Sequence, residues 1–321
     1  MIKPFFIMNP GSRSGQSRRK FDLIMDQFSK RGIPFIHRFT ESLNHATELT
    51  FTANEQGYDP IVAVGGDGTI NAVINGFFDN EGKNVVNSRF GIIYTGTSPD
   101  FCKSYEIPTN MFAALQTIIA EKTRKIPIGK VKMIKSSPDA VGNQKNEVIP
   151  SDTGFFGCCA NIGLGAALAR MANSGIRKYI GDHAGTFASL LWILSHHSPV
   201  DCKVVIDDEE TLFTKVYNIS VGRTPLIASG IKVNHFFEDD NKSLYVLVLR
   251  NMKWNGIIPV LRQIYGDKPI QNSQQLQLLT GTKISIDPLG KNLEVEFDGD
   301  PHGYAPCMIE LAADPLEVLV G

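Results

Sequence analysis

The clearest chemical signal in the sequence is a glycine-rich turn between an apolar run and a stretch of helical length. The apolar run covers residues 61–64, the helical stretch starts at Ile70, and the turn between them reads Gly65, Gly66, Asp67, Gly68 and Thr69. Glycines let backbone N–H groups approach phosphate oxygens closely, and a helix N-terminus adds partial positive charge. The carboxylate can orient a magnesium-bound phosphate, and the hydroxyl can donate to an oxygen. The turn therefore predicts a phosphate site. Because neither G-x-G-x-x-G nor G-x-x-x-x-G-K-[ST] is present, it does not indicate a dehydrogenase or a P-loop enzyme.

Three further polar loops stand at matching places in the chain. Residues 9–15 follow the first apolar run and combine an arginine with hydroxyl groups ahead of a helix. Residues 94–101 follow the fourth run, with Ser98 as the predicted N-cap and Pro99 at the first helical position. Late in the chain, residues 297–301 contain an Asp-Gly pair that predicts a hairpin turn.

The first two of these loops and the glycine-rich turn need a parallel sheet to bring them together. Short apolar runs alternate with amphipathic stretches of helical length, which is the βαβ rhythm. The predicted strands are Lys3–Met8, Pro34–Arg38, Pro60–Val64 and Arg89–Tyr94, and the predicted helices are Ser17–Arg31, Asn44–Gln56, Ile70–Phe78 and Asn110–Glu121. Residues 1–125 are therefore expected to form an open, mostly parallel α/β domain, which binds ligands beyond the carboxyl ends of its strands.

A second domain is predicted for residues 126–321. Beyond Ile126 the sequence alternates polar and apolar residues between turn signals, as half-exposed antiparallel strands do. Strands are predicted at residues 130–135, Gly154–Ala160, Cys202–Ile206, Phe213–Val221, Ser243–Leu249, Leu276–Ile286, Leu293–Phe297 and Met308–Leu311, with one helical insertion at Tyr179–His197. We expect a mainly antiparallel β-sandwich or flattened barrel, whose last residues can pack back on the first domain.

Composition restricts the classes of function that remain. The chain has 321 residues and a formal net charge of −1, so it offers no chain-wide basic surface for nucleic acid. Its five cysteines form no C-x-x-C pair, which argues against a disulfide framework and a structural zinc. The N-terminal apolar run is too short for a signal-peptide core, and residues 184–194 fall short of the roughly 20 residues that a membrane-spanning helix needs. We expect a cytoplasmic protein.

Several motifs, in this order along the chain, resemble the diacylglycerol kinase catalytic family, which includes bacterial lipid kinases and the sphingosine and ceramide kinases. The G-G-D-G-T motif of that family is intact here from Gly65 to Thr69. Its N-P-x-[SA]-G, G-T-x-N-D-F, N-x-G-x-G and D-G-E-P motifs are matched in turn by Asn9, Pro10 and Gly15, by Gly96, Thr97, Asp100 and Phe101, by residues 161–165, and by residues 298–301. The resemblance covers essentially the whole chain.

The resemblance implies an ATP-dependent lipid kinase with a nucleotide-binding α/β domain, a β-rich lipid-handling domain and an active site in the cleft between them. ATP and Mg²⁺ would be its cofactors, and its substrate would be a lipid alcohol, most readily diacylglycerol. In the catalytic set, Asp300 would take the hydroxyl proton, Asp67 would position the phosphate and magnesium, and Asp298 would complete the carboxylates. Nucleotide contacts are expected from Asn9, Thr40, Gly65, Gly66, Asp67, Gly68, Thr69, Asn71, Thr97 and Asp100.

A structural magnesium site is also implied by the resemblance. Many bacterial members carry it on a D-D-G-L-L loop, to which residues 238–244 correspond, with Asp240, Asn241 and Ser243 as the candidate ligands. Asn241 replaces an Asp, and Lys242 brings an ammonium group where Gly is usual, so a hard cation would be held less strongly. A solvated acidic turn between strands is an equally good interpretation.

Other departures from the family pattern keep two alternatives open. The usual Glu of the base position is Asp300, the Asn of the third motif is Pro99, and a carboxylate ahead of the second domain is Pro127. These changes are compatible with a non-catalytic lipid- or nucleotide-binding descendant. NAD kinases and phosphofructokinases also use a G-G-D-G-[TS] turn, although the motifs at residues 97–101 and 298–301 favour the lipid branch. Without a polybasic segment or a lipid anchor, membrane contact should be transient, and a homodimer is compatible with the sequence.

Overall fold

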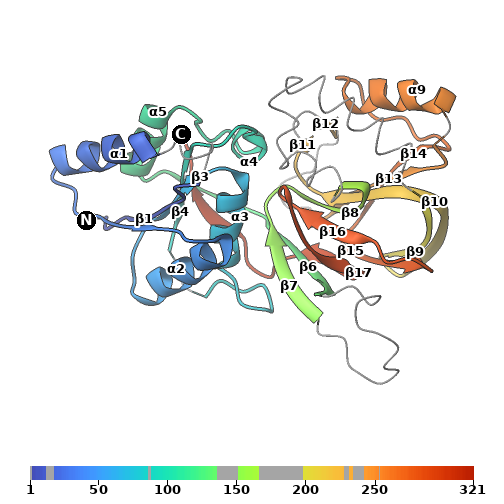
Figure 1. Ribbon diagram of the computed structural model, residues 1–321, viewed down its shortest axis with the longest axis horizontal. Helices are drawn as coiled ribbons and strands as arrows, with labels where there is room; N and C mark the ends of the chain where they lie inside the picture. The colour runs from blue at the N-terminus through green and yellow to red at the C-terminus, as the bar shows by residue number, and fades with distance from the viewer. Residues whose placement is uncertain are drawn as a thin grey trace. The chain divides into compact units, whose positions relative to one another are not determined.

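The computed structural model divides the chain into two compact units (Figure 1). Unit 1 comprises Met1–Ile128, Phe155–Gly157 and Ala312–Gly321, and unit 2 comprises Gly129–Gly154 and Cys158–Leu311. The structure describes residues 2–11, 18–85, 88–135, 151–165, 198–227, 231–233, 242–252 and 254–321. The predicted helical insertion at Tyr179–His197 lies outside these residues. Each unit has its own sheet, so the two are described separately.

Unit 1 is built on a sheet with the strand order β2-β1-β3-β4-β18-β5. The strands are β1 (Phe5–Met8), β2 (Ile36–Phe39), β3 (Ile61–Gly65), β4 (Phe90–Tyr94), β5 (Thr123–Ile126) and β18 (Leu316–Leu319). All neighbouring pairs are parallel except β18 and β5, which are antiparallel. The expected open, mostly parallel α/β domain is therefore confirmed. The last strand of the chain lies within its sheet, between β4 and β5.

Helices cover both faces of this sheet. They are α1 (Arg18–Lys30), α2 (Leu43–Glu55), α3 (Asp67–Asn75), α4 (Asp100–Ser104) and α5 (Met111–Ala120). On one face, α1 and α5 pack their apolar sides on β1 and β3, in a core that includes Phe6, Phe28, Val62 and Ile118. Helices α2 and α3 contact each other and the strands β1 and β3. Because both faces are covered, the central strands are apolar throughout, which is why their sequence signal is a continuous run rather than an alternation.

The strand order also determines where a ligand can bind in unit 1. The chain leaves β1 for β2 on one side and returns to β3 on the other side of β1. At such a switch point the connections diverge and leave a crevice at the carboxyl ends of the two central strands. Here those ends are followed by Asn9, after β1, and by Gly66, after β3.

Unit 2 is an antiparallel β-rich domain, as expected. Its strands are β6 (Gly129–Ile134), β7 (Ser151–Phe156), β8 (Cys159–Gly163), β9 (Val200–Ile206), β10 (Glu209–Gly222), β11 (Leu226–Ile227), β12 (Ile231–Lys232), β13 (Leu244–Arg250), β14 (Leu276–Gly281), β15 (Lys283–Leu289), β16 (Glu294–Phe297) and β17 (Asp300–Leu311). The order β10-β8-β16-β17-β15-β9 closes on itself, because β9 also pairs with β10. The centre of the unit is thus a closed ring, which leaves those strands without free edges.

Two predicted strands of unit 2 are wrong, since each covers parts of two strands. Residues 154–160 contain the end of β7, a turn and the start of β8. Residues 276–286 are interrupted at Thr282, whose N–H and hydroxyl both donate to the Asp207 carboxylate at 2.6–3.0 Å. The next N–H, from Lys283, also donates to Asp207 at 2.9 Å. A side chain from a distant hairpin therefore ends β14 and starts β15. Helix α9 (Trp254–Ile264), which contains Pro259, was not predicted.

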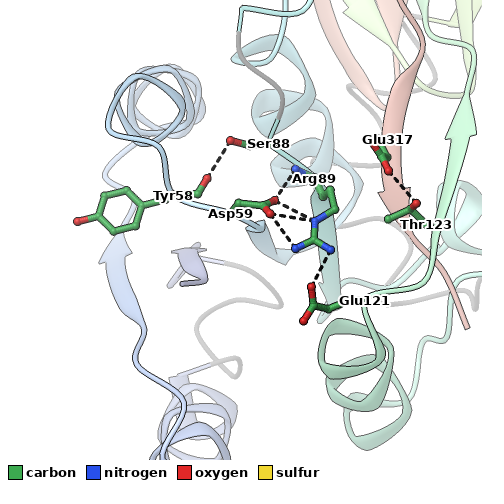
Figure 2. A network of polar contacts seen from close by, with 7 residues as sticks. All are labelled: Tyr58, Asp59, Ser88, Arg89, Glu121, Thr123 and Glu317. Atoms are coloured by element: carbon green, nitrogen blue, oxygen red, sulfur yellow. Dashed lines mark hydrogen bonds and ion pairs between the residues drawn. The ribbon is translucent and has the colours of Figure 1, made fainter. Parts of the chain in front are cut away.

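A polar network ties together the amino ends of β3 and β4 in unit 1 (Figure 2). The Arg89 guanidinium donates to both oxygens of Asp59 at 2.7–3.1 Å and to Glu121 at 2.9 Å. The Arg89 side chain is 18% exposed, whereas its two carboxylate partners remain partly hydrated. The hydrogen bond with Asp59 raises the pKa of Arg89 above its ordinary value. The network lies at the end of the sheet opposite to the switch point, so it serves the fold.

We expect Arg89→Met to lower the free energy of unfolding by about 1–3 kcal/mol, because the change removes charge-assisted hydrogen bonds and leaves Asp59 without its cation. Urea denaturation followed by circular dichroism would measure the loss. Lys30→Met is the matched control, because it breaks the exposed Lys30–Asp26 pair on α1. That control should change stability by less than about 0.5 kcal/mol. Equal effects of the two variants would contradict the role given to the network.

Candidate active site

The glycine-rich turn lies at the switch point and opens α3. Gly66 is the N-cap residue, and the N–H groups of Thr69 and Ile70 both donate to its carbonyl at 3.0 Å. The helix thus starts at Asp67, three residues earlier than the sequence predicts, and contains Gly68 in its first turn. The partial positive charge of the α3 N-terminus is therefore located directly beside Gly66 and Asp67.

The glycines of this turn are required by packing within unit 1. A Cβ atom on Gly65 would lie 2.3 Å from Thr69 Oγ1, which no side chain tolerates. A Cβ atom on Gly66 would lie 3.2 Å from the Gly96 Cα atom, and one on Gly96 would lie 2.7 Å from the Gly66 Cα atom. The loop after β3 and the loop after β4 therefore touch backbone to backbone. Two of the predicted nucleotide loops form one surface.

Asp67 is held by a residue that the sequence analysis missed. The Tyr94 hydroxyl, at the end of β4, donates to Asp67 Oδ2 at 2.8 Å. Burial, followed by the charge of Asp67, raises the pKa of Tyr94 above its ordinary range, so the phenol stays a protonated donor. Strand pairing sets Tyr94 beside Gly65. The available signal was a hydroxyl-bearing residue at the carboxyl end of the strand next to the glycine-rich turn.

Asn9 and Thr69, both predicted nucleotide contacts, bind each other. Asn9 Nδ2 donates to Thr69 Oγ1 at 2.8 Å, and Asn9 Oδ1 accepts from the Gly11 N–H at 2.9 Å. This bond bridges the carboxyl end of β1 and the first turn of α3, across the switch point. Thr40 lies after the neighbouring strand β2, where its N–H donates to the Met8 carbonyl and its side chain is buried. These side chains line the same end of the sheet.

The Asn71 side chain is engaged in a contact within unit 1. Its side-chain amide donates to the Phe155 carbonyl at 2.8 Å, and Asn75 Nδ2 donates to the same oxygen at 2.8 Å. The Phe155 N–H in turn donates to Asn75 Oδ1 at 2.9 Å. The two asparagines therefore fasten the Phe155 segment to α3 within unit 1. The nucleotide contact predicted for Asn71 stays a prediction.

The third loop differs from the prediction at its helix start. Pro99, not Ser98, occupies the N-cap position of α4, with φ −81° and ψ 54°. The Ser98 N-cap prediction is wrong because that ψ lies outside the helical region, so the helix begins only at Asp100. The Asp100 N–H donates to the Ser98 carbonyl at 2.9 Å, and the Thr97 side chain is exposed. Thr97 thus belongs to the loop that contacts the glycine-rich turn, and Asp100 opens the helix that follows this loop.

In unit 2, the remaining predicted carboxylates share one tight turn. Asp298 and Gly299 have φ values of 50° and 99° and join β16 to β17, which is the geometry of a two-residue hairpin turn. Asp298 Oδ1 accepts from the Cys158 N–H at 3.0 Å, so this side chain also fastens the hairpin to the β7–β8 turn. Asp300 is the first residue of β17, and burial raises the pKa of its carboxyl group.

A second missed residue, Glu296, precedes this turn. It is 5% exposed, accepts from the Gly299 N–H at 2.7 Å and accepts from Asn161 Nδ2 at 2.7 Å. Burial raises the pKa of Glu296 to about 7. The alternation of β16, with Val295 and Phe297 apolar, predicts a solvent-facing Glu at this position, so the sequence carried no signal for it.

Little of the predicted structural metal site can be described. Asp240 and Asn241 lie outside the described residues, and the backbone carbonyl of Ser243 accepts from Arg223 Nη1 at 2.8 Å. Among the described residues, no group of three or more His, Cys, Asp or Glu side chains is arranged to hold a metal ion.

No helix in the described part of the chain combines the length and the apolar character needed to cross a bilayer.

Comparisons with known proteins match both units. Residues 3–131 match the family model of the diacylglycerol kinase catalytic domain, and residues 159–320 match that of the YegS C-terminal NAD kinase beta sandwich-like domain. The diacylglycerol kinases of Staphylococcus aureus (strain MRSA252) and Staphylococcus saprophyticus are each 32% identical to the chain over 142 residues. That alignment spans 44% of this chain and 44% and 45% of the two relatives, respectively, so it covers less than half of their length.

Solved structures agree over a longer stretch. A putative diacylglycerol kinase from Bacillus anthracis str. Sterne superimposes with a TM-score of 0.73 at 19% identity, over 99% of this chain and 97% of that chain. A second structure of a diacylglycerol kinase from the same organism gives a TM-score of 0.67 at 19% identity and the same coverage. At this identity the likeness supports the two-domain fold alone. The two family models between them match most of the sequence, and they lead to one conclusion: the chain belongs to the diacylglycerol kinase catalytic family.

Proposed function

We propose that the chain is an ATP-dependent lipid kinase that transfers the γ-phosphate of ATP to the hydroxyl group of a lipid alcohol, with diacylglycerol as the first candidate. The observation that carries the proposal is the placement of Asp67. It lies at the N-terminus of α3, at the switch point of a parallel sheet, and its carboxylate is oriented by the Tyr94 hydroxyl. A helix N-terminus beside an oriented carboxylate suits a nucleotide phosphate with its metal ion.

The nucleotide would be bound by unit 1. Backbone N–H groups of the turn from Gly66 to Gly68 would face the phosphates, and the polar side chains after β1, β2 and β4 would surround them. Asn9 Nδ2 and Thr69 Oγ1 already bind each other, so the phosphate would meet a bonded pair rather than two mobile side chains. Such preorganisation lowers the entropy lost on binding.

Asp67 also fits the chemistry of Mg²⁺, which is usually held by one or two carboxylates together with substrate phosphates and water. The ion would neutralise negative charge on the β- and γ-phosphates. Asp67 would contribute an oxygen ligand from a partly exposed position at the start of α3.

The lipid hydroxyl would lose its proton to Asp300 of unit 2. As the hydroxyl oxygen forms a bond to the γ-phosphorus, the bond from that phosphorus to the β–γ bridging oxygen breaks, and ADP leaves. The O–H proton passes to the Asp300 carboxylate, which acts as general base. Asp298 would hold the hairpin in place through its bond to the Cys158 N–H.

The proposed function also implies a location, a set of partners and a fate for the product. A lipid alcohol resides in a bilayer, so we place the protein in the cytoplasm with transient contact to a membrane surface. No nucleic-acid partner is proposed, because the formal net charge of −1 gives no chain-wide basic excess for one. The phosphorylated product would enter lipid metabolism, in particular phospholipid biosynthesis.

The direct test is transfer of radiolabelled γ-phosphate from ATP by the full chain in the presence of Mg²⁺. Mixed micelles would present diacylglycerol, sphingosine or phosphatidylglycerol, and NAD⁺ would be tested in parallel as a soluble acceptor. We expect label in the organic phase with a lipid acceptor, dependent on Mg²⁺. Label on NAD⁺ alone would overturn the proposal in favour of an NAD kinase-like enzyme. Nucleotide binding by calorimetry without transfer to any acceptor would overturn it in favour of a binding protein.

A further inference from the structure

A buried carboxylate lies on β16, a strand of the unit 2 ring, next to the turn that carries Asp300. Glu296 is on β16, which pairs with β8 on one side and β17 on the other, and it is 5% exposed. Glu is rarely found in such a place, because removing a carboxylate from water costs several kcal/mol unless hydrogen bonds compensate. An apolar residue would fit a strand between two others at lower cost.

Both oxygens of Glu296 are bound. Oε1 accepts from the Gly299 N–H at 2.7 Å, and Oε2 accepts from Asn161 Nδ2 at 2.7 Å. Asn161 is in turn fixed from behind, since its Oδ1 accepts from Ser220 Oγ at 2.6 Å and from Asn218 Nδ2 at 3.3 Å. These four side chains, which we call the polar ladder, run from β16 across β8 to β10.

At its β10 end the polar ladder binds the backbone of Gly165, whose N–H donates to Asn218 Oδ1 at 2.9 Å. At its β16 end it binds the backbone of Gly299, the second residue of the hairpin turn. Asp298 precedes that residue and Asp300 follows it. An N–H bonded to a fixed carboxylate restricts the peptide planes on either side, and so the direction in which both aspartates leave the backbone. Two like charges next to Glu296 oppose its ionisation, so the contact is kept against an electrostatic cost.

We propose that Glu296 is a positioning residue, which holds the Gly299 N–H against the polar ladder and thereby fixes the Asp300 carboxyl group for proton transfer. The inference rests on the proposed role of Asp300 as the base. It adds to that role the residue that orients the base, which acts through the backbone of the turn and does not touch the substrate.

An exchange of polarity between two partners tests this contact. In Glu296→Gln the side-chain oxygen of the new glutamine can still accept from the Gly299 N–H. The NH₂ group of the glutamine would then face the NH₂ group of Asn161, and two donors cannot form a hydrogen bond. Turning the Asn161 amide over would not help, because its NH₂ would then face Asn218 Nδ2. In the double variant Glu296→Gln/Asn161→Asp, the introduced carboxylate accepts from the introduced amide, from Ser220 and from Asn218. Every hydrogen bond of the polar ladder is then kept, with the direction of the bond between the two exchanged side chains reversed.

We expect Glu296→Gln and Asn161→Asp each to lower kcat by roughly 10- to 100-fold with little change in KM for ATP, because a displaced base affects the chemical step. The double variant should recover to within about threefold of the original kcat. Glu294→Gln, the same chemical change on the same strand, is the matched control and should leave kcat unchanged. Hydrogen exchange of the Gly299 amide provides a readout that needs no activity: it should be slow in the original chain and in the double variant, and faster in Glu296→Ala.

Three results would overturn the inference. One is an unchanged kcat in Glu296→Gln and Glu296→Ala. Another is a double variant that regains slow Gly299 exchange but not kcat, since the contact would then not act on the base. The third is a Gly299 amide that exchanges equally fast with and without Glu296. If the original chain transfers no phosphate to any acceptor, the proposed function is wrong, and the Gly299 exchange rates alone then decide whether Glu296 holds the turn.

Discussion

Replacing Asp300 by Asn is expected to lower the rate of phosphate transfer by about 10²–10⁴-fold, the range that a positioned general base contributes. Asn has nearly the same shape as Asp but accepts no proton at neutral pH. The two-residue turn depends on Asp298 and Gly299, so the hairpin should fold normally. Nucleotide binding should be unchanged, because its proposed contacts lie in unit 1. Single-turnover transfer of labelled phosphate, with calorimetry of ATP binding alongside, would measure both quantities.

The pH dependence of the same variant sharpens the test. Burial raises the pKa of Asp300, so in the original chain the deprotonated base is lost as pH falls, at a higher pH than for an exposed Asp. The residual rate of Asp300→Asn should lack this acid limb. Asp300→Glu, which keeps the carboxylate on a longer side chain, should retain far more activity than Asp300→Asn. A rate for Asp300→Asn within about threefold of the original would show that another group takes the proton.

The parallel half of the fold was predictable because its signal is local. Strands buried on both faces appear as short continuous apolar runs, and β1, β3 and β4 start or end within two residues of the predicted positions. The start of α3 was the exception. Gly68 lowers helix propensity, so the pattern suggested a start at Ile70, but capping by Gly66 at the switch point extends the helix back to Asp67.

The antiparallel β-rich character of unit 2 was predictable from the sequence, but the pairing of its strands was not. The pairing of β9 with β15 and the neighbours of β8 depend on register between distant segments, which local alternation does not encode. The interruption between β14 and β15 comes from the Asp207 side chain, which lies 75 positions earlier than Thr282. Helix α9 contains Gly256 and Pro259, both poor helix formers, and it is held by packing of residues such as Ile257 and Leu261.

The candidate site could be predicted from the sequence wherever residue type and loop position agreed. Gly65 to Thr69, Asn9 and Asp298 to Asp300 all lie at or next to the ends of strands, and their residue types suit phosphate binding or proton transfer. Tyr94 and Glu296 were missed for a common reason. Each is an ordinary strand residue by its local pattern, and its role exists only through a partner on a neighbouring segment, Asp67 in one case and Gly299 in the other. Such residues orient the groups that the motifs identify.

The second prediction with a large effect concerns the contact between Tyr94 and Asp67. Two variants separate the contribution of the Asp67 charge from that of its orientation. Asp67→Asn keeps an oxygen that accepts from the Tyr94 hydroxyl but loses the negative charge, so we expect kcat/KM to fall by about 10²–10³-fold. The Mg²⁺ concentration needed for half-maximal rate should rise, because the metal loses a charged oxygen ligand. Tyr94→Phe keeps the charge and removes only the orienting hydrogen bond, and its loss should not exceed about tenfold.

Initial rates at several Mg²⁺ concentrations would distinguish the two variants of this contact. Tyr105→Phe is the control, since it removes a comparable buried hydroxyl of unit 1, which donates to the Gly157 carbonyl at 2.9 Å, away from Asp67. It should change neither the Mg²⁺ dependence nor kcat/KM. A loss in Tyr94→Phe as large as in Asp67→Asn would mean that the phenol itself contacts the phosphates. An unchanged Mg²⁺ dependence in Asp67→Asn would remove Asp67 from the metal site, and the helix N-terminus would then act on the phosphates without it.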